Sequence, residues 1–350
     1  MNKEQMKQLK KGVSPFEKSD VKASVLQLLN TIPPFFLLWF LAYHSLKAST
    51  VLAVFAAIAA AGFLVRVFII FHDCTHNSFF PSRKANDRLG TLLGIMTLFP
   101  YEKWKRDHNI HHASNGNLDK RGTGDIWVMT VEEYVSASFW QRLAYRLYRN
   151  PFVMFVLGPL YLLLVSNRKN HRGAKRKERL NTHFITASAV IIYALIIMLV
   201  GWKAFLLIQG TILYVAAALG IWLFYVQHQF EDAYFENKEE WNYVKAAIDG
   251  SSYYKLSKPL QWMTGNIGFH HVHHLSPRVP NYHLEKAHEM NPALHEVTTI
   301  TLRSSLRSLS FRLYDAQRKT FVRFRDVKPL IKQTKTKGNM PAVLPSRKWS

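Results

Sequence analysis

The sequence predicts an all-α integral membrane protein, with four transmembrane helices in two hairpins beneath a cytoplasmic helical cap. Three observations lead to this fold class: four long apolar runs, very short links within each pair of runs, and positive charge that gathers outside them. Each run has about the ~20 residues that a helix needs to cross ~30 Å of hydrocarbon. Helices buried in a soluble core rarely run so far without polar side chains, which disfavours that alternative.

The expected elements follow in order along the chain. Residues 1–24 are polar and lysine-rich, so we expect a cytoplasmic segment and no cleavable signal peptide. Residues 25–321 form the main domain, and residues 322–350 form a basic C-terminal tail. Two shorter apolar stretches of the domain, 89–100 and 151–165, are expected to associate with the membrane without spanning it. The transmembrane helices are expected over residues 25–43, 50–71, 184–202 and 205–230.

The position of the charged residues predicts the orientation. The chain has 46 Lys and Arg against 23 Asp and Glu, a net charge of +23, which suits a polyanionic partner such as nucleic acid or an anionic membrane. This charge gathers at both ends and in 168–179, whereas the hairpin links hold only Lys47 and Lys203. By the positive-inside rule, both termini and 168–179 lie in the cytoplasm of a plasma-membrane protein. The charge therefore predicts a membrane partner and no nucleic acid.

Histidines are the second unusual feature. Of 16 in the chain, ten fall in four groups. Spacings of three and four residues place imidazoles on one face of a helix, so each group can direct its rings at one point. A lone histidine on a helix is usually a satisfied polar residue, but that does not explain several groups with ligand spacing. The topology inferred from charge also places every group on the cytoplasmic side. The groups are His72 and His76; His108, His111 and His112; His228; and His270, His271, His273 and His274.

These groups predict a metal centre. Neutral imidazole suits zinc, copper, iron or nickel. Contributions of two, three, one and three ligands give nine, which is too many for one ion and right for a pair. The absence of an HExxH motif disfavours a zinc protease, and a single cysteine, Cys74, excludes cysteine-based zinc or iron–sulfur sites. An all-histidine dinuclear site at the end of a helix bundle indicates iron and O₂ chemistry.

The histidine motifs resemble those of a known family. HDCTH, HNIHH and HHVHH match, in order, the three histidine boxes of the membrane-bound fatty acid desaturases. The flanking segments FIIFHDCTHNSFF, WLFYVQHQFEDAYF and GNIGFHHVHHLSPRVPNYHL are similar to bacterial acyl-lipid desaturases, most of all to the bacilli-type acyl-lipid Δ5 desaturases. Residues 25–321 are then a desaturase domain.

The resemblance implies a set of site residues. His271 would point about 100° away from His270 on a helix, so we expect it outside the metal site. Asp73 and Asp125 are expected to accept hydrogen bonds from the ring N–H groups of ligating histidines. Animal acyl-CoA desaturases have a metal-site asparagine where this chain has Phe224, so water, Gln227 or nothing replaces it. The implied ligands of two iron ions are His72, His76, His108, His111, His112, His228, His270, His273 and His274.

The activity implied by the resemblance is O₂-dependent introduction of a cis double bond into the acyl chains of membrane phospholipids, at Δ5, which adjusts membrane fluidity. Trp104, Trp127 and Trp262 are candidates for the lining of an acyl channel. Without a GxGxxG or HPGG motif, the chain needs a separate electron donor, and the resemblance implies ferredoxin or flavodoxin.

Two alternatives remain open. A membrane di-iron hydroxylase shares the histidine boxes and differs in its product. A metal-ion transporter is less favoured, because its ionisable ligands would lie near the membrane midplane. Here the crossings hold only Arg66.

Overall fold

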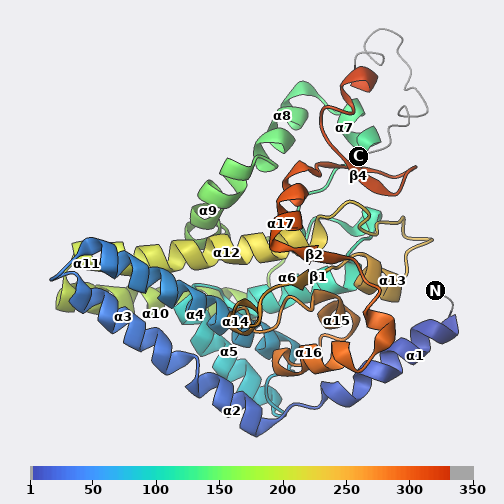
Figure 1. Ribbon diagram of the computed structural model, residues 1–350. Coiled ribbons are helices and arrows are strands. Elements are labelled where there is room, and N and C mark those ends of the chain that lie inside the picture. Colours follow the sequence, from blue (N-terminus) through green and yellow to red (C-terminus); the bar gives the residue numbers. More distant parts are fainter. Residues whose placement is uncertain (1–2, 332–350) are drawn as a thin grey trace.

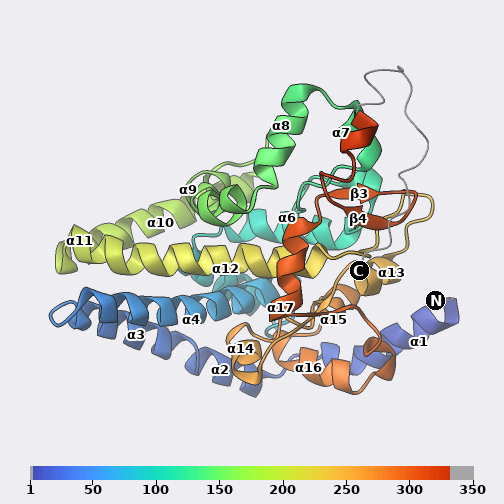
Figure 2. The same ribbon diagram turned by 45° about the horizontal axis from the view of Figure 1, so that its top comes forward.

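The computed structural model describes residues 3–331, so most of the expected tail, 322–350, lies outside the described residues. Within them, four helical segments are long and apolar enough to cross a membrane, as the sequence predicts. They extend side by side from one end of the molecule, and a cap of shorter elements covers the other end (Figure 1, Figure 2). These segments are Val21–Ser45, Thr50–His76, Arg176–Val200 and Trp202–His228.

The first hairpin consists of α2 (Val21–Leu29), α3 (Ile32–Ser45) and α4 (Thr50–His76). A proline near the start of α3 suits the first helical turn, where its missing N–H has no partner to lose, and this explains the break between α2 and α3. Helix α4 runs five residues beyond the expected end at residue 71. The apolar run stops there, but the HDCTH motif continues the helix and carries its histidines into the cap.

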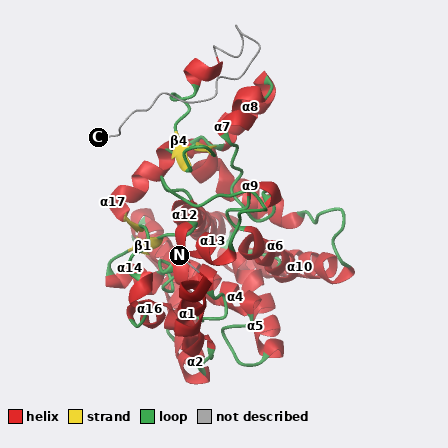
Figure 3. Cartoon of the chain, turned by 90° about the vertical axis from the view of Figure 1, so that its right-hand side faces the viewer, coloured by secondary structure: helices red, strands yellow, loops and turns green. Residues whose placement is uncertain are grey.

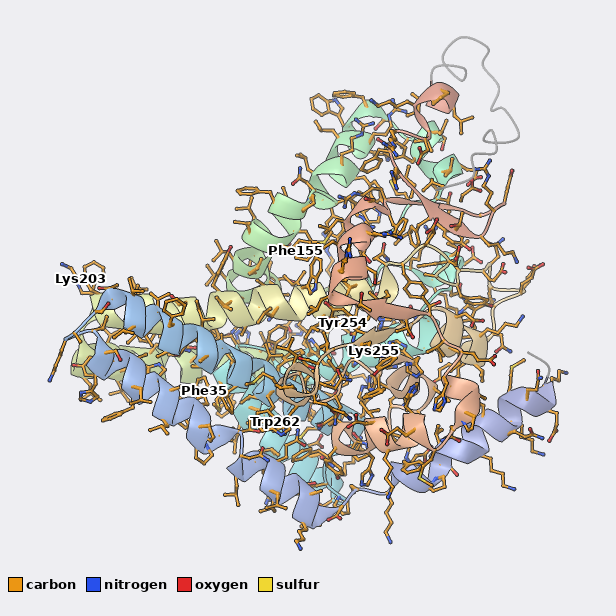
Figure 4. The ribbon with its side chains drawn as sticks, viewed as in Figure 1. Phe35, Phe155, Lys203, Tyr254, Lys255 and Trp262 are labelled. Atoms are coloured by element: carbon orange, nitrogen blue, oxygen red, sulfur yellow. The ribbon has the colours of Figure 1, made fainter. Side chains whose placement is uncertain are left out.

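The second hairpin consists of α10 (Arg176–Val200), α11 (Trp202–Phe205) and α12 (Thr211–His228), with a π-helical turn over Leu206–Gly210. Gly201 makes the turn with φ of 82°, a backbone conformation that glycine adopts without strain. Lys203 therefore lies at the free end of the bundle, far from Tyr254 and Lys255 in the cap (Figure 4).

The shorter apolar stretches also form helices. Residues 83–97 form α5 (Arg83–Thr97), which covers most of the expected 89–100 segment. The 151–165 segment contains a π-helical turn, Val153–Leu157, followed by α9 (Gly158–Leu164). Together with α8 (Phe139–Tyr148) it makes a pair bent by 62°, which is the geometry of a broken span or a re-entrant loop.

The cap holds short helices and two small sheets, so it is less purely helical than expected. Strands β1 and β2 pair in parallel, and β3 and β4 pair antiparallel. Because β4 crosses residue 321 and Val327 and Leu330 are buried, the packed domain continues past the expected boundary at 321. The strands are β1 (Tyr253–Lys255), β2 (Thr299–Thr301), β3 (Leu313–Asp315) and β4 (Thr320–Val322).

The cap helices surround the ends of α4 and α12. Leu9 and Val13 of α1 pack against Val272, Leu275 and Leu284 in one apolar cluster, so the N-terminal helix is fixed on the cap. Figure 3 looks onto this end of the molecule, with α1 and α13 near its middle. The remaining cap helices are α1 (Lys3–Val13), α6 (Tyr101–Ser114), α7 (Val131–Ser136), α13 (Tyr243–Asp249), α14 (Lys258–Met263), α15 (His270–Leu275), α16 (Asn281–Glu289) and α17 (Leu302–Ser305).

Candidate metal centre

Four helices converge at the junction of bundle and cap, and each contributes histidines. The last turns of α4 and α12 supply His72, His76 and His228. Helices α6 and α15 supply the rest, and all nine side chains are buried except His76, which is partly buried. The structure therefore brings together the nine side chains that the sequence singled out. They are His72, His76, His108, His111, His112, His228, His270, His273 and His274.

The nine imidazoles divide into two clusters. In the first cluster, five histidines each direct one ring nitrogen so that the five atoms lie within 4.8 Å of one another. Neighbouring Nε2 atoms are 2.8 Å apart for His72 and His108, 3.0 Å for His108 and His112, and 2.9 Å for His112 and His273. The fifth member is His76.

The second cluster adjoins the first. Ring nitrogens of His111, His228 and His274 also lie within 4.8 Å of one another. Nε2 of His270 lies 3.0 Å from Nε2 of His228 and 3.1 Å from Nε2 of His274, which makes it the fourth member. The rings of His112 and His274 stack across the boundary with centroids 4.2 Å apart. Sets of five and four imidazoles suit two neighbouring transition-metal ions.

Three of the outer ring nitrogens have acceptors of the kind found beside metal-binding histidines. Nδ1 of His111 lies 2.5 Å from an oxygen of Asp125, Nδ1 of His72 lies 3.3 Å from one of Asp73, and Nδ1 of His228 lies 3.1 Å from the carbonyl oxygen of Gly250. An N–H on Nδ1 leaves the lone pair of Nε2 directed into the cluster, as in metal-binding histidines.

Buried nitrogen without a protein partner supports the same conclusion. Nε2 of His76 is buried, and no hydrogen-bond partner for it exists among the described residues. Because a buried polar atom is costly to leave unpaired, this nitrogen fits a metal ion as its partner. The residues present therefore fit a metal pair.

Burial keeps these imidazoles neutral. Desolvation lowers the pKa of His108, His112, His270, His273 and His274 well below the usual value, and neighbouring imidazoles lower it further. Metal binding needs the unprotonated ring. At neutral pH, binding an ion therefore displaces no proton from these five rings.

The acidic residues expected beside the ligands lie in contact with them. Asp73 also accepts two hydrogen bonds from Asn281, at 2.6 Å from its backbone N–H and 2.8 Å from its side-chain amide, so this carboxylate is held from both sides. Asp125 reaches His111 because Gly124 approaches α6 closely. A Cβ at Gly124 would lie 2.6 Å from the carbonyl oxygen of Asp107.

Other expected residues lie outside the clusters. Nε2 of His271 contacts Nδ1 of His288 at 3.0 Å, so His271 faces away from the nine. The ring of Phe224 packs against His111 and His228, with centroids 5.1 and 5.0 Å away. The side-chain amide of Gln227 donates to the carbonyl of Ile267 at 2.7 Å, so this N–H is not directed at the histidines.

A cavity of about 740 Å³ adjoins the metal centre, between α4, α6, α9 and α12. Its walls near the histidines include His108, Trp104 and Phe224, and its lining on α12 runs from Tyr225 back to Leu213. Twelve residues of helix correspond to a length of about 18 Å. The lining along α12 and α9 is almost entirely apolar, so the cavity suits a long hydrocarbon chain.

Comparison with known proteins now identifies the family. The family model described as "Fatty acid desaturase" matches residues 48–303, which is more than half of the chain. The chain belongs to the fatty acid desaturase family. It is 58% identical over 322 residues to a protein of Bacillus subtilis (strain 168) described as "Fatty acid desaturase", and the match covers 92% of each chain.

More distant desaturases of Synechocystis match two thirds of this chain. The chain is 26% identical over 249 residues to the "sn-1 oleoyl-lipid 12-desaturase", covering 67% of this chain and 68% of the relative. It is 28% identical over 243 residues to the "sn-1 acyl-lipid omega-3 desaturase (ferredoxin)", covering 66% and 65%. The family expected from the histidine boxes is therefore confirmed.

Of the three tryptophans considered for a channel of this desaturase, one lines the cavity. The ring of Trp104 packs against His108, with centroids 4.0 Å apart and planes tilted by 32°. Trp127 instead contacts Tyr145 and Tyr148. Trp262 packs over the guanidinium of Arg66 at 4.1 Å, beside α4 (Figure 4).

Sequence reasoning missed a fully buried cation beside the site. Arg149 donates to Gln229 Oε1 at 2.6 Å and to the carbonyl of Phe311 at 2.8 Å, and Gln229 donates to the carbonyl of His228. Arg149 thereby fixes the end of α12 that carries His228. Nothing local in the sequence marks it, because its partners are 80 and 162 residues away.

Proposed function

We propose that this chain is an acyl-lipid desaturase that introduces a cis double bond into membrane phospholipids with two iron ions and O₂. The observation that carries the proposal is the position of two histidine clusters at the end of a long apolar cavity. The first cluster shares His108 with the cavity wall, so an acyl chain there would pass beside the metal centre.

The proposed ligands are the five histidines of the first cluster and the four of the second. An all-nitrogen donor set with open positions suits iron and O₂. When bound, two iron ions would supply the oxidising power to remove hydrogen from an unactivated C–H bond, which no side chain provides. Asp73 and Asp125 would hold the rings of His72 and His111 in place through Nδ1.

The overall reaction balances with external electrons. One acyl –CH₂–CH₂– unit, O₂, two electrons and two protons give one –CH=CH– unit and two molecules of water. The protein would bind and orient the chain and exclude bulk water through its apolar walls. We infer a ferredoxin or flavodoxin as the electron donor, in line with the relative whose name includes ferredoxin.

The same proposal covers location and product. Four membrane spans and the basic 168–179 segment at the cap end support a multi-pass plasma-membrane protein with the metal centre and both termini in the cytoplasm. The Δ5 position follows from the resemblance of the flanking sequences, and the physiological role would be the adjustment of membrane fluidity.

The alternatives predict other results. A hydroxylase would use the same clusters and cavity but leave a hydroxyl group on the chain. A metal-ion transporter is disfavoured because, among the described residues, the clusters lie at the ends of α4 and α12 and not at their middle.

Expression in a desaturase-free host fed deuterated saturated phospholipid tests the proposal. Gas chromatography–mass spectrometry should show a monounsaturated acyl chain that has lost two deuterium atoms, and mapping of the double bond should place it at Δ5. A hydroxylated chain would favour the hydroxylase, and an unchanged chain would contradict both.

A further inference from the structure

The cavity has one polar corner in its largely apolar lining. Lys103, Ser166 and Asn167 meet there, where the start of α6 approaches the end of α9. Among the lining residues that the structure describes, Lys103 is the one cationic side chain. A cation in the wall of an acyl cavity calls for a polar partner, because a buried charge is costly unless it is hydrogen-bonded.

The ammonium of Lys103 has more hydrogen-bond donors than its protein partner uses. It donates to the carbonyl oxygen of Ser166 at 2.6 Å, and within residues 3–331 no carboxylate lies within 4.0 Å of it. An ammonium has three N–H donors. Two of them therefore remain for a ligand oxygen in the cavity.

Helix geometry relates this corner to the metal centre. Lys103 precedes His108 by five residues on α6, about 7.5 Å along the axis. The indole of Trp104, which packs against His108, belongs to the same cavity wall. An extended polypeptide advances about 3.6 Å over the three backbone bonds of a residue, which is about 1.2 Å per bond. We apply the same advance per bond to an extended acyl chain. For a chain that runs along α6, an oxygen at the level of Lys103 therefore places carbons about six bonds away at the level of His108.

We propose that Lys103 binds the ester carbonyl oxygen of the lipid substrate and so sets which carbons of the acyl chain reach the metal centre. This inference rests on the proposed function. The chain would then run past Trp104 and His108 and along α12. A carbonyl oxygen suits this corner better than a phosphate, because a phosphate would bring a full negative charge into a lining that already holds the carboxylate of Asp107, paired with Arg106, and has Lys103 as its one cation among the described residues.

Enzyme kinetics test the contact. Full-length protein with its electron donor is reconstituted in vesicles that contain dipalmitoyl phosphatidylglycerol at varied mole fraction, as wild type, Lys103→Met, Lys103→Arg and Lys169→Met. Lys169 is exposed and three residues beyond Ser166, so it is a matched control outside the cavity lining. A hydrogen bond to a charged group corresponds to about a tenfold to hundredfold effect on KM.

We expect Lys103→Met to raise KM by about tenfold to hundredfold and to spread the double bond over several positions. Its iron content should be unchanged. Lys103→Arg should restore most of both properties, and Lys169→Met should behave as wild type. Wild-type KM and a single product position in Lys103→Met would overturn the proposal.

An ether lipid separates the carbonyl from the phosphate. Native mass spectrometry compares binding of the ester lipid with that of its dihexadecyl ether analogue, which keeps the phosphate and lacks the carbonyl. Wild type should prefer the ester, and Lys103→Met should lose the preference. Equal binding of ester and ether to wild type, with Lys103→Met weakening both, would assign Lys103 to the phosphate instead. Because this comparison needs no turnover, a chain that fails to desaturate contradicts the proposed function without deciding the role of Lys103.

Discussion

Asp125 accepts a hydrogen bond from Nδ1 of His111, while Nε2 of the same ring faces Nε2 of His228 at 3.2 Å. The loop residue Asp125 thereby orients the ring of His111, which links α6 to the end of α12. Asp73 makes a similar contact with His72 and is itself held by Asn281. Each half of the metal centre thus has a carboxylate that orients one of its rings.

Replacing Asp125 with asparagine should weaken metal binding. The amide lacks the charge that keeps Nδ1 of His111 as the donor, and loss of such partners typically costs about tenfold to hundredfold in metal affinity. Iron titration of the purified protein measures the change. Asp119→Asn is the matched control, because Asp119 accepts from the backbone of Lys238 away from the clusters. Equal iron affinity in both variants would contradict the role given to Asp125.

The neighbours His270 and His271 should respond in opposite ways to alanine. His270 contacts His228 and His274 in the second cluster, whereas His271 contacts His288 outside it. We expect His270→Ala to lose iron and all detectable desaturation. His271→Ala should keep its iron and most of its activity. Metal analysis and product yield check both variants, and the reverse order would exclude His270 as a ligand.

Filling the cavity should shorten the acyl chains that the enzyme accepts. Gly220 lines the cavity on α12, and a Cβ there meets no atom within 4 Å, so Gly220→Leu adds bulk without a clash at the backbone. We expect activity on a C18 lipid to fall more than on a C14 lipid, as measured by product yield. Gly210→Leu, at another open position outside the lining, should leave the ratio unchanged. A parallel loss on both lipids in Gly220→Leu would show that the acyl chain lies elsewhere.

Acid should destabilise the cap through His288. Burial and, to a smaller extent, the nearby His295 lower the pKa of His288 to about 4, while Glu285 opposes the shift. Between the usual pKa near 6.5 and about 4, the unfolded chain binds a proton that the folded chain does not, so stability falls as pH falls through this window. Thermal unfolding in detergent at pH 7.5 and 5 should show a smaller loss in His288→Asn than in wild type. The same loss in both would remove His288 as a cause.

The residues of the metal site could be predicted from the sequence, but their arrangement within the site could not. Spacings of three and four residues placed the histidines of each motif on one helix face, and the apolar runs placed those helices in one bundle. Helix ends were harder to predict, because hydropathy falls at the polar HDCTH motif while α4 continues through it to His76.

The division of ligands between two clusters could not be read from the sequence. His111 and His112 are adjacent, yet they join different clusters because the helix turns by about 100° per residue. Which ring meets which partner depends on how α6 packs against α12 and α15. For the same reason Asn281 was missed, since it reaches Asp73 across 208 residues.

Metal analysis of the purified full-length protein, by mass spectrometry for content and Mössbauer spectroscopy for the iron sites, tests most directly the claim that nine histidines hold two iron ions. We predict two iron ions per chain in wild type, and loss of iron from both His111→Ala and His273→Ala, one from each cluster. A single metal ion per chain, or full iron content and activity in either variant, would contradict the claim.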